Sequence, residues 1–125
     1  MRQGARASAA PGARLRSHER IRRRADFKRV YDRGSKVHGR FLTLFALPND
    51  LAYARLGVAA TRKLGNAVVR SRAKRLIREV FRRNKPAPGF DIVIVAKRDL
   101  LDAPLTSLDA EYLRSLSRAR AAPRL

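Results

Sequence analysis

The sequence predicts one small α/β (α+β) domain in which about three helices pack on a short β-sheet. Its 125 residues suit a single domain with a modest core. Some stretches place apolar residues every three or four positions, as helices do, whereas others are runs of β-branched and aromatic residues bounded by turn formers. There are no cysteines, which excludes disulfides and thiolate metal sites and favours a reducing cytoplasm.

The folded part is expected to span residues 17–118. Residues 1–16 are rich in Gly, Pro, Ala and Arg and contain one large apolar residue, Leu15, too few to offset the entropy lost on ordering. We therefore expect a disordered basic arm there, and a flexible tail at residues 119–125. No apolar run approaches the roughly 18 residues that a membrane helix needs, and the start lacks the apolar centre of a secretory signal.

The stretch at residues 23–34 predicts the first helix, which closes at Gly34. Phe27, Val30 and Tyr31 are spaced i, i+3 and i+4, which places them on one face. Gly34 follows the last helical residue, and we expect it to adopt the left-handed conformation that often ends a helix.

Two strands are predicted next, at residues 40–47 and 54–61. The first is rich in aromatic and β-favouring residues and ends at Pro48, and the second alternates apolar and other residues. Because a short turn separates them, we expect an antiparallel pair. Residues 34–39 are a candidate for an additional edge strand, although two glycines weaken it.

A strongly basic helix is predicted to follow Gly65, with Asn66 as its N-cap. Its apolar stripe is expected to pack on the sheet and comprises Val69, Ala73, Leu76, Ile77 and Val80. The helix should stop at residues 84–88, which include two prolines.

The remaining chain predicts one strand and one helix. Residues 90–97 form an almost continuous β-branched run, which indicates a strand covered on both faces. Leu105, Leu108, Tyr112 and Leu116 then recur at helical spacing.

The charge distribution points to a polyanionic partner. The chain carries a formal net charge of +20, and residues 1–83 hold 23 basic and 5 acidic residues. On the basic helix, the face opposite the apolar stripe carries Ser71, Arg75, Arg78 and Arg82, flanked by Arg72, Lys74 and Arg70. This face is either an ordinary solvated surface or an anion-binding surface. The clustered arginines favour the second, because the single acid of the helix, Glu79, leaves most of them unneutralised. Like charges at i, i+4 destabilise a helix, whereas arginine forks bind phosphates.

Three segments resemble the protein subunit of bacterial ribonuclease P, in the order found in that family. They are "RADFKRVYDRGSKVHGRF" at 24–41, "RKLGNAVVRSRAKRLIREVFR" at 62–82 and "GFDIVIVAKRDL" at 89–100. The resemblance covers roughly residues 15–118. One departure is Ser71 between Arg70 and Arg72, where the family usually has asparagine. This leaves position 71 doubtful as an RNA contact.

The resemblance implies a two-layer α/β (α+β) sandwich. Its small mixed sheet would have three to four strands, in the order α-β-β-(β)-α-β-α. It also implies a left-handed β-α-β crossover, although general rules would predict a right-handed one.

The function implied by the resemblance is assistance to a catalytic RNA that removes the 5′ leader of precursor tRNA. Magnesium ions would be held mainly by the RNA and substrate, so neither catalytic residues nor metal ligands are expected in the protein. The expected partners are the catalytic RNA and precursor tRNA, without a membrane or an obligate protein partner, in the cytoplasm. The residues implied as catalytic-RNA contacts are Arg62, Lys63, Asn66, Arg70, Arg72, Lys74, Arg75 and Arg78. Those implied for the leader cleft are Phe27, Lys28, Tyr31 and Phe41.

The residues themselves leave two explanations for Phe27 and Tyr31. Aromatic residues at helical spacing usually belong to a core. However, unpaired nucleotides are held by aromatic rings beside basic groups, and Arg24, Lys28 and Arg29 are close in sequence.

The same residues bear on three other functions. A nuclease using the only two histidines, His18 and His38, with a lysine lacks a plausible carboxylate pair. Duplex DNA binding lacks a helix-turn-helix or zinc spacing. A ribosomal-type structural RNA-binding protein remains the main alternative, because charge, size and an α/β sheet do not distinguish it.

Overall fold

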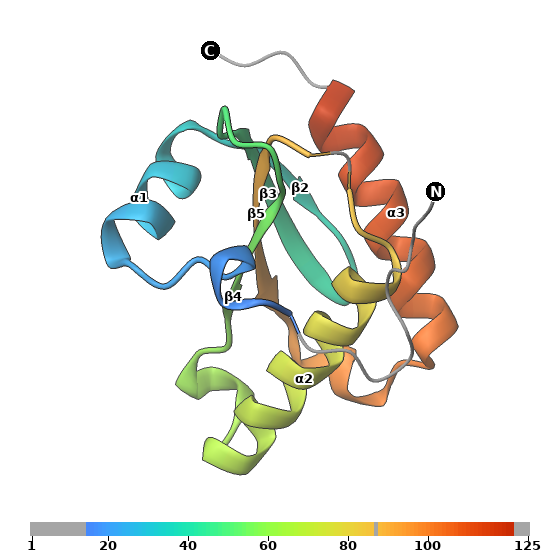
Figure 1. Ribbon diagram of the computed structural model, residues 1–125. Coiled ribbons are helices and arrows are strands. Elements are labelled where there is room, and N and C mark those ends of the chain that lie inside the picture. The colour runs from blue at the N-terminus through green and yellow to red at the C-terminus, as the bar shows by residue number, and fades with distance from the viewer. Residues whose placement is uncertain (1–14, 87, 122–125) are drawn as a thin grey trace.

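Three α-helices and a four-stranded mixed sheet form the computed structural model, which describes residues 15–86 and 88–121 (Figure 1). In chain order the elements are α1 (Arg24–Arg33), β2 (Ser35–His38), β3 (Leu42–Pro48), β4 (Arg55–Ala59), α2 (Ala67–Arg83), β5 (Phe90–Ala96) and α3 (Leu105–Ala121). Short 3₁₀ turns occur at Ser17–Glu19, Arg62–Leu64 and Arg98–Asp102. This order confirms the predicted fold class, including the edge strand β2.

The predicted antiparallel pairing of the strands at 40–47 and 54–61 is wrong. The strand order in the sheet is β2-β3-β5-β4, so β5 lies between β3 and β4. β5 pairs antiparallel with β3, with Val93 opposite Phe45, and parallel with β4, with Val93 opposite Gly57. The physical reason is the composition of β5: Ile92, Val93 and Ile94 are fully buried, and a central position covers such a strand on both faces and both edges.

The chain between β4 and β5 forms a β-α-β unit, because α2 connects the two parallel strands. Its handedness stays a prediction. The apolar stripe of α2 packs against the sheet as expected, and Phe81 adds a fully buried ring at its end.

Helices lie on both faces of the sheet, as Figure 1 shows with α1 on one side and α2 and α3 on the other. Leu44, Ile92 and Ile94 belong to the larger core cluster, which also contains Leu108 and Tyr112. The alternate residues of the same strands belong to a smaller cluster on the other face that includes Ile21, Val30, Phe45, Leu47 and Val93. The sheet therefore separates two cores, and the apolar face of α1 packs in the smaller one.

The folded region reaches Leu15 and Ala121, slightly beyond the expected limits of 17 and 118. Leu15 and Ala119 are buried, and α3 continues to Ala121. The rest of the predicted basic arm and of the predicted tail lies outside the described residues.

Gly34 does not adopt the predicted left-handed conformation. Its backbone is extended, with φ −74° and ψ 157°. A Cβ at this position would lie 2.6 Å from the Val30 carbonyl oxygen and 3.1 Å from that of Ala46. Glycine is therefore needed here because the end of α1 passes very close to β3.

A buried carboxylate ties α3 to the turn between β2 and β3. The Glu111 side chain accepts hydrogen bonds from the backbone N–H groups of Arg40, Phe41 and Leu42 at 2.9, 2.7 and 3.0 Å. Gly39 leaves room for it, since a Cβ there would overlap the Glu111 carboxylate. Three donors satisfy a charge that is only 5 % exposed.

Candidate nucleic-acid interface

The basic helix α2 begins with the predicted cap. The Val69 N–H donates a hydrogen bond to the Asn66 side-chain oxygen at 3.0 Å. Gly65, with φ 146°, lies in the region that favours glycine and redirects the chain from the preceding 3₁₀ turn into the helix. The Asn66 oxygen is thus used in capping, and the partial positive charge of the helix N-terminus adds to the side-chain charges nearby.

The seven cations predicted to contact RNA divide into two groups. Arg62, Lys63, Arg72 and Arg75 are exposed, whereas Arg70, Lys74 and Arg78 are half-buried. Within residues 15–86 and 88–121, none of the seven forms an ion pair with an acid. We refer to these seven residues as the α2 basic face. Ser71 is exposed beside them.

The contacts that α2 basic-face residues do make are few and go mainly to backbone. The Arg72 guanidinium donates to the Leu101 carbonyl oxygen at 3.4 Å. The Arg70 Nε is buried without a hydrogen-bond partner in the described part of the chain. Burial, together with the charge of Arg20, lowers the pKa of Arg78. Bound anions would supply hydrogen-bond partners and opposite charge for these arginines. The stability of the fold by itself gives no reason to place so many cations on one helix face.

Arg82 does not belong to the exposed face on which helical spacing placed it. Its side chain is only 8 % exposed and forms an ion pair with Glu79. Helical spacing alone did not predict the burial of Arg82, because the guanidinium turns toward the carboxylate of Glu79, three residues earlier on the helix.

Aromatic rings gather where α1 meets the sheet. Tyr31 is 38 % exposed, and its ring stacks edge-on against Phe45 with centroids 4.9 Å apart. The Phe27 ring is 6.3 Å from that of Tyr31, and the Lys36 ammonium lies 5.6 Å from the Phe45 ring centre. We call Phe27, Tyr31, Phe45 and Lys36 the α1 aromatic surface. The burial of Tyr31 raises the pKa of its hydroxyl, so this hydroxyl is a neutral donor at neutral pH.

Lys28 lies on the same helix but is already paired. Its ammonium group is 2.6 Å from the Asp32 carboxylate, and both side chains are exposed. An exposed pair of this kind contributes little and can exchange partners. Phe45 was missed by sequence reasoning. The available signal was its position in β3, where alternation places it on the face opposite Leu44.

Comparison with known proteins supports the family resemblance along most of the chain. The family model for ribonuclease P matches residues 15–120. The chain belongs to the ribonuclease P protein family. The ribonuclease P protein component of Syntrophus aciditrophicus is 46% identical over 85 residues, which cover 66% of this chain and 71% of that protein. For the component of Pelotomaculum thermopropionicum the identity is 38% over 101 residues, covering 79% and 90%.

Solved structures of the ribonuclease P family share the fold. The RNase P protein of Staphylococcus aureus has a TM-score of 0.71 and 32% sequence identity, covering 82% of this chain and 95% of that one. The protein of Thermotoga maritima has a TM-score of 0.71 and 33% identity, covering 80% and 96%. Both structures therefore share the overall fold of this chain.

Phe41, which the ribonuclease P resemblance implied for the leader cleft, does not pack with Phe27, the helix-side ring implied for the same cleft. It precedes β3 and packs against the larger core, on the side of α3. Its backbone N–H is held by Glu111, and the Arg40 guanidinium lies 5.3 Å from its ring centre. The structure therefore does not bring Phe41 together with Phe27 and Tyr31, and the strand-side ring of the α1 aromatic surface is Phe45.

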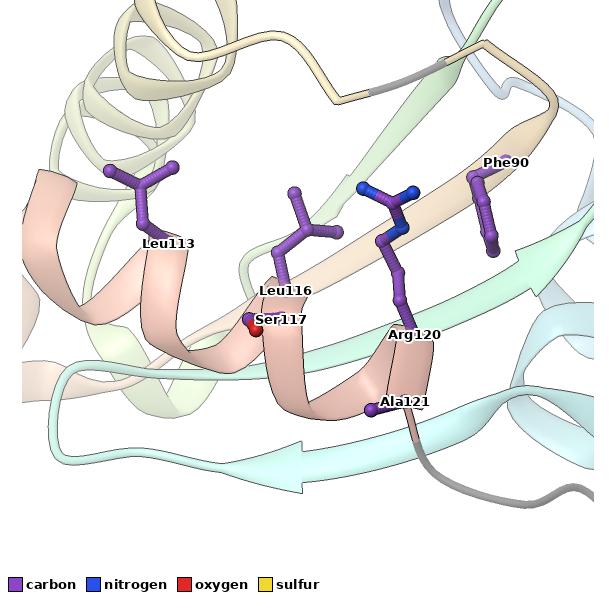
Figure 2. Close-up of a pocket in the computed structure, with 6 residues that line it drawn as sticks. All are labelled: Phe90, Leu113, Leu116, Ser117, Arg120 and Ala121. Carbon is purple, nitrogen blue, oxygen red and sulfur yellow. The ribbon is translucent and has the colours of Figure 1, made fainter.

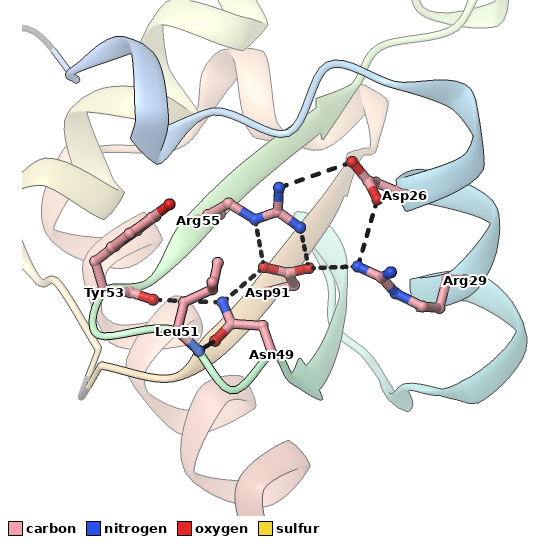
Figure 3. Close-up of polar contacts among 7 residues, drawn as sticks. All are labelled: Asp26, Arg29, Asn49, Leu51, Tyr53, Arg55 and Asp91. Atoms are coloured by element: carbon pink, nitrogen blue, oxygen red, sulfur yellow. Dashed lines mark hydrogen bonds and ion pairs between the residues drawn. The ribbon is translucent and has the colours of Figure 1, made fainter.

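A buried ion network fixes α1 against the sheet (Figure 3). Asp91 on β5 is fully buried and accepts two hydrogen bonds from Arg55, at 2.8 and 2.7 Å, and one from Asn49 at 2.8 Å. Arg29 on α1 reaches the same carboxylate at 3.3 Å, and Asp26 lies near both arginines. Although burial opposes ionisation, Arg55, Asn49 and Arg29 hold the pKa of Asp91 below its ordinary value. The network sets the position of the helix that carries Phe27 and Tyr31.

The two histidines lie at opposite edges of the sheet. His18 stacks edge-on against Tyr53, near β4, with ring centroids 4.7 Å apart. His38 lies on the edge strand β2, with its Nδ1 3.4 Å from the Thr43 hydroxyl. A nuclease site that needs both imidazoles is therefore not assembled by this fold.

A pocket of about 520 Å³ lies between β5 and the last turns of α3 (Figure 2). Its lining is mainly apolar, from Phe90, Leu113 and Leu116, and the Arg120 guanidinium lies 5.1 Å from the Phe90 ring centre. It contains none of the predicted site residues.

Among the described residues, no helix is long and apolar enough to span a membrane.

Proposed function

We propose that this protein binds the catalytic RNA of ribonuclease P through the α2 basic face and assists removal of the 5′ leader from precursor tRNA. The observation that carries the proposal is the set of seven cations on α2 and its preceding turn. They lack acidic partners in the described structure, in a chain of the ribonuclease P family. Arginine forks on a rigid helix suit phosphates held at fixed positions.

The α1 aromatic surface is proposed to bind the unpaired nucleotides of the leader. Exposed Tyr31 and half-buried Phe27 offer ring faces, and Lys36 adds a positive charge over the neighbouring Phe45 ring. Stacking of a base on an aromatic ring typically contributes about 1–3 kcal/mol and does not depend on sequence. This suits a protein that must accept many different leaders.

Catalysis in this proposal belongs to the RNA subunit. The proposal assigns magnesium mainly to the RNA and substrate, as the family resemblance implies; the described residues hold no group of three His, Asp or Glu side chains that could bind a metal ion. The protein supplies positive charge that reduces repulsion between two polyanions, and it positions the leader.

The test is reconstitution at low magnesium. Purified protein is added to a bacterial ribonuclease P RNA together with a precursor tRNA, and release of the leader is followed. We expect the protein to restore cleavage, and Arg72→Ala with Arg75→Ala to impair it, whereas Arg118→Ala on α3 should act as wild type. If the protein binds these RNAs but never restores cleavage, the ribosomal-type structural RNA-binding alternative replaces this proposal.

A further inference from the structure

The pocket between β5 and the last turns of α3 lies apart from both proposed RNA surfaces (Figure 2). Its volume of about 520 Å³ is bounded by Phe90, Leu113, Leu116, Ser117, Arg120 and Ala121. None of these residues belongs to the α2 basic face or to the α1 aromatic surface. Helix α3 also covers the face of the sheet opposite α1 (Figure 1). A molecule bound in this pocket would therefore leave α1 and α2 free to contact RNA.

The rim of the pocket is an exposed apolar surface. The Leu113 side chain is 47 % exposed, whereas Tyr112 and Leu116 of the same helix are buried in the larger core. Leu113, Leu116 and Arg120 are spaced i, i+3 and i+7, and Figure 2 shows their side chains on one side of α3. The half-buried Phe90 extends the apolar lining onto β5. An exposed apolar side chain at the edge of an apolar pocket is typical of a surface that contacts another molecule.

The charges beside the pocket are positive. From Leu113 to Ala121 the helix carries Arg114, Arg118 and Arg120 and no acid. None of these arginines forms an ion pair with an acid within residues 15–86 and 88–121. Arginines near the C-terminal end of a helix are favourable in themselves. The pocket therefore indicates that something binds, and the arginines indicate that the complementary partner is acidic.

Arg120 joins the charged and the apolar parts of this surface. Its guanidinium lies 5.1 Å from the Phe90 ring centre. This cation–π contact involves the ring and leaves the guanidinium N–H groups available to a carboxylate. One partner could thus contact the apolar lining and Arg120 at the same time.

The lining favours a protein side chain over a nucleotide base. Phe90 is the one aromatic ring among the six lining residues, and Arg120 already lies over it. Stacking of a base needs an accessible ring face, whereas leucine side chains suit the apolar anchor residue of a protein partner. A second copy of this chain fits poorly, because it would bring together two sets of these arginines in chains of net charge +20.

We propose that this pocket is the docking site for an acidic protein segment, which inserts a large apolar side chain beside Leu113 and Phe90 and places a carboxylate against Arg120. The partner is recognised by an apolar anchor flanked by acidic residues. Such a segment would link the RNA-bound protein to another protein. The proposal does not depend on the ribonuclease P function.

Docking is tested on the full-length protein with two labelled peptides of equal charge. Both consist of glutamates around a central pair of residues, which is Leu-Leu in one peptide and Ser-Ser in the other. Because the α2 basic face attracts both peptides by charge alone, only the difference between them reports on the pocket. In NMR spectra of the isotopically labelled protein, the Leu-Leu peptide should shift the amide signals of Leu113, Ser117 and Arg120, and the Ser-Ser peptide should shift them far less. Equal shifts with both peptides, or no shifts at these amides, would overturn the site.

Two pocket variants with matched controls locate the contact. Leu113→Gln removes the apolar rim, and its control is Leu51→Gln, at an exposed leucine outside the pocket. Arg120→Gln removes the charge, and its control is Arg118→Gln on the same helix. The affinity for the Leu-Leu peptide, measured by fluorescence polarisation, should fall about tenfold in Leu113→Gln and about threefold in Arg120→Gln, with the controls close to wild type. Unchanged affinity in both pocket variants, or equal weakening in their controls, would contradict the proposal.

Thermal unfolding separates loss of docking from loss of the fold. Leu113 and Arg120 are both exposed, so both variants should melt as wild type does. If Leu113→Gln melts at a lower temperature, Arg120→Gln still decides, because it leaves the apolar residues of α3 in place. Lower melting of both variants together with wild-type peptide affinity would assign these residues to the fold and refute the docking site.

Two other occupants would give different results. A single-stranded RNA oligonucleotide that shifts the pocket amides more than the Leu-Leu peptide does, and binds Arg120→Gln more weakly, would assign the pocket to RNA. A sedimentation mass that rises with protein concentration, and rises less in Leu113→Gln, would assign it to a second copy of this chain. Either result would replace the acidic segment as the occupant and overturn the proposal.

Discussion

Replacing Asp91 by asparagine removes one buried charge at the junction of α1, β4 and β5. The carboxylate is fully buried and accepts from Arg55, Asn49 and Arg29. In the variant, the amide oxygen could still accept one hydrogen bond, but the amide NH2 would face donors, and Asp26 at 3.7 Å would be the one described carboxylate left near Arg55. Breaking a buried ion pair from one side typically costs about 3–5 kcal/mol.

This cost should be visible in thermal unfolding followed by circular dichroism. For a domain of about 100 residues, 1 kcal/mol lowers the melting temperature by about 4–8 °C, so a fall of more than about 10 °C is expected at pH 7. Asp102→Asn is the matched control, because that acid is exposed and forms no described ion pair. It should change stability by less than about 0.5 kcal/mol.

The pH dependence gives a second, independent measurement. The folded-state pKa of Asp91 lies below its ordinary value of 3.8, so its contribution to stability is complete above the unfolded-state pKa. The contribution is lost as the pH falls through the folded-state pKa. The stability gap between wild type and Asp91→Asn should therefore be constant near neutral pH and narrow below about pH 4. A gap under about 0.5 kcal/mol at pH 7, or one that does not narrow in acid, would refute the reasoning.

Three further outcomes follow from the described contacts. Arg72→Ala and Arg75→Ala should each weaken catalytic-RNA binding and reduce its salt dependence by about one phosphate contact, with an unchanged circular dichroism spectrum; lost helicity would make them structural. Tyr31→Ala should reduce the preference for precursor over mature tRNA by about 1–3 kcal/mol, and leaders of one nucleotide should abolish the difference. Gly39→Ala should lower the free energy of unfolding in urea by about 1–3 kcal/mol, because the new Cβ would displace the Glu111 carboxylate. An unchanged free energy of unfolding would show that the turn accommodates the Cβ by a small shift.

The sequence alone determined the parts of this protein that depend on neighbouring residues. Helix α2 has the predicted cap at Asn66, the predicted apolar stripe and the predicted end at Asn84. The apolar run of β5 indicated burial on both faces, and its central place in the sheet agrees. Capping, helical periodicity and β-branched runs depend on residues only a few positions apart, so they can be predicted from the sequence alone.

The tertiary structure alone decided the features that join distant segments. β5 lies between β3 and β4, although those strands are consecutive, because the most apolar strand gains most from a central position. Phe45, rather than Phe41, meets Tyr31, because the turn before β3 sends Phe41 into the opposite core. Arg20 and Arg78, 58 positions apart in the sequence, line one pocket only because the segment before α1 bridges to β4 beside α2. Local spacing carries no information about such pairings, since they follow from how whole elements share the available buried surface.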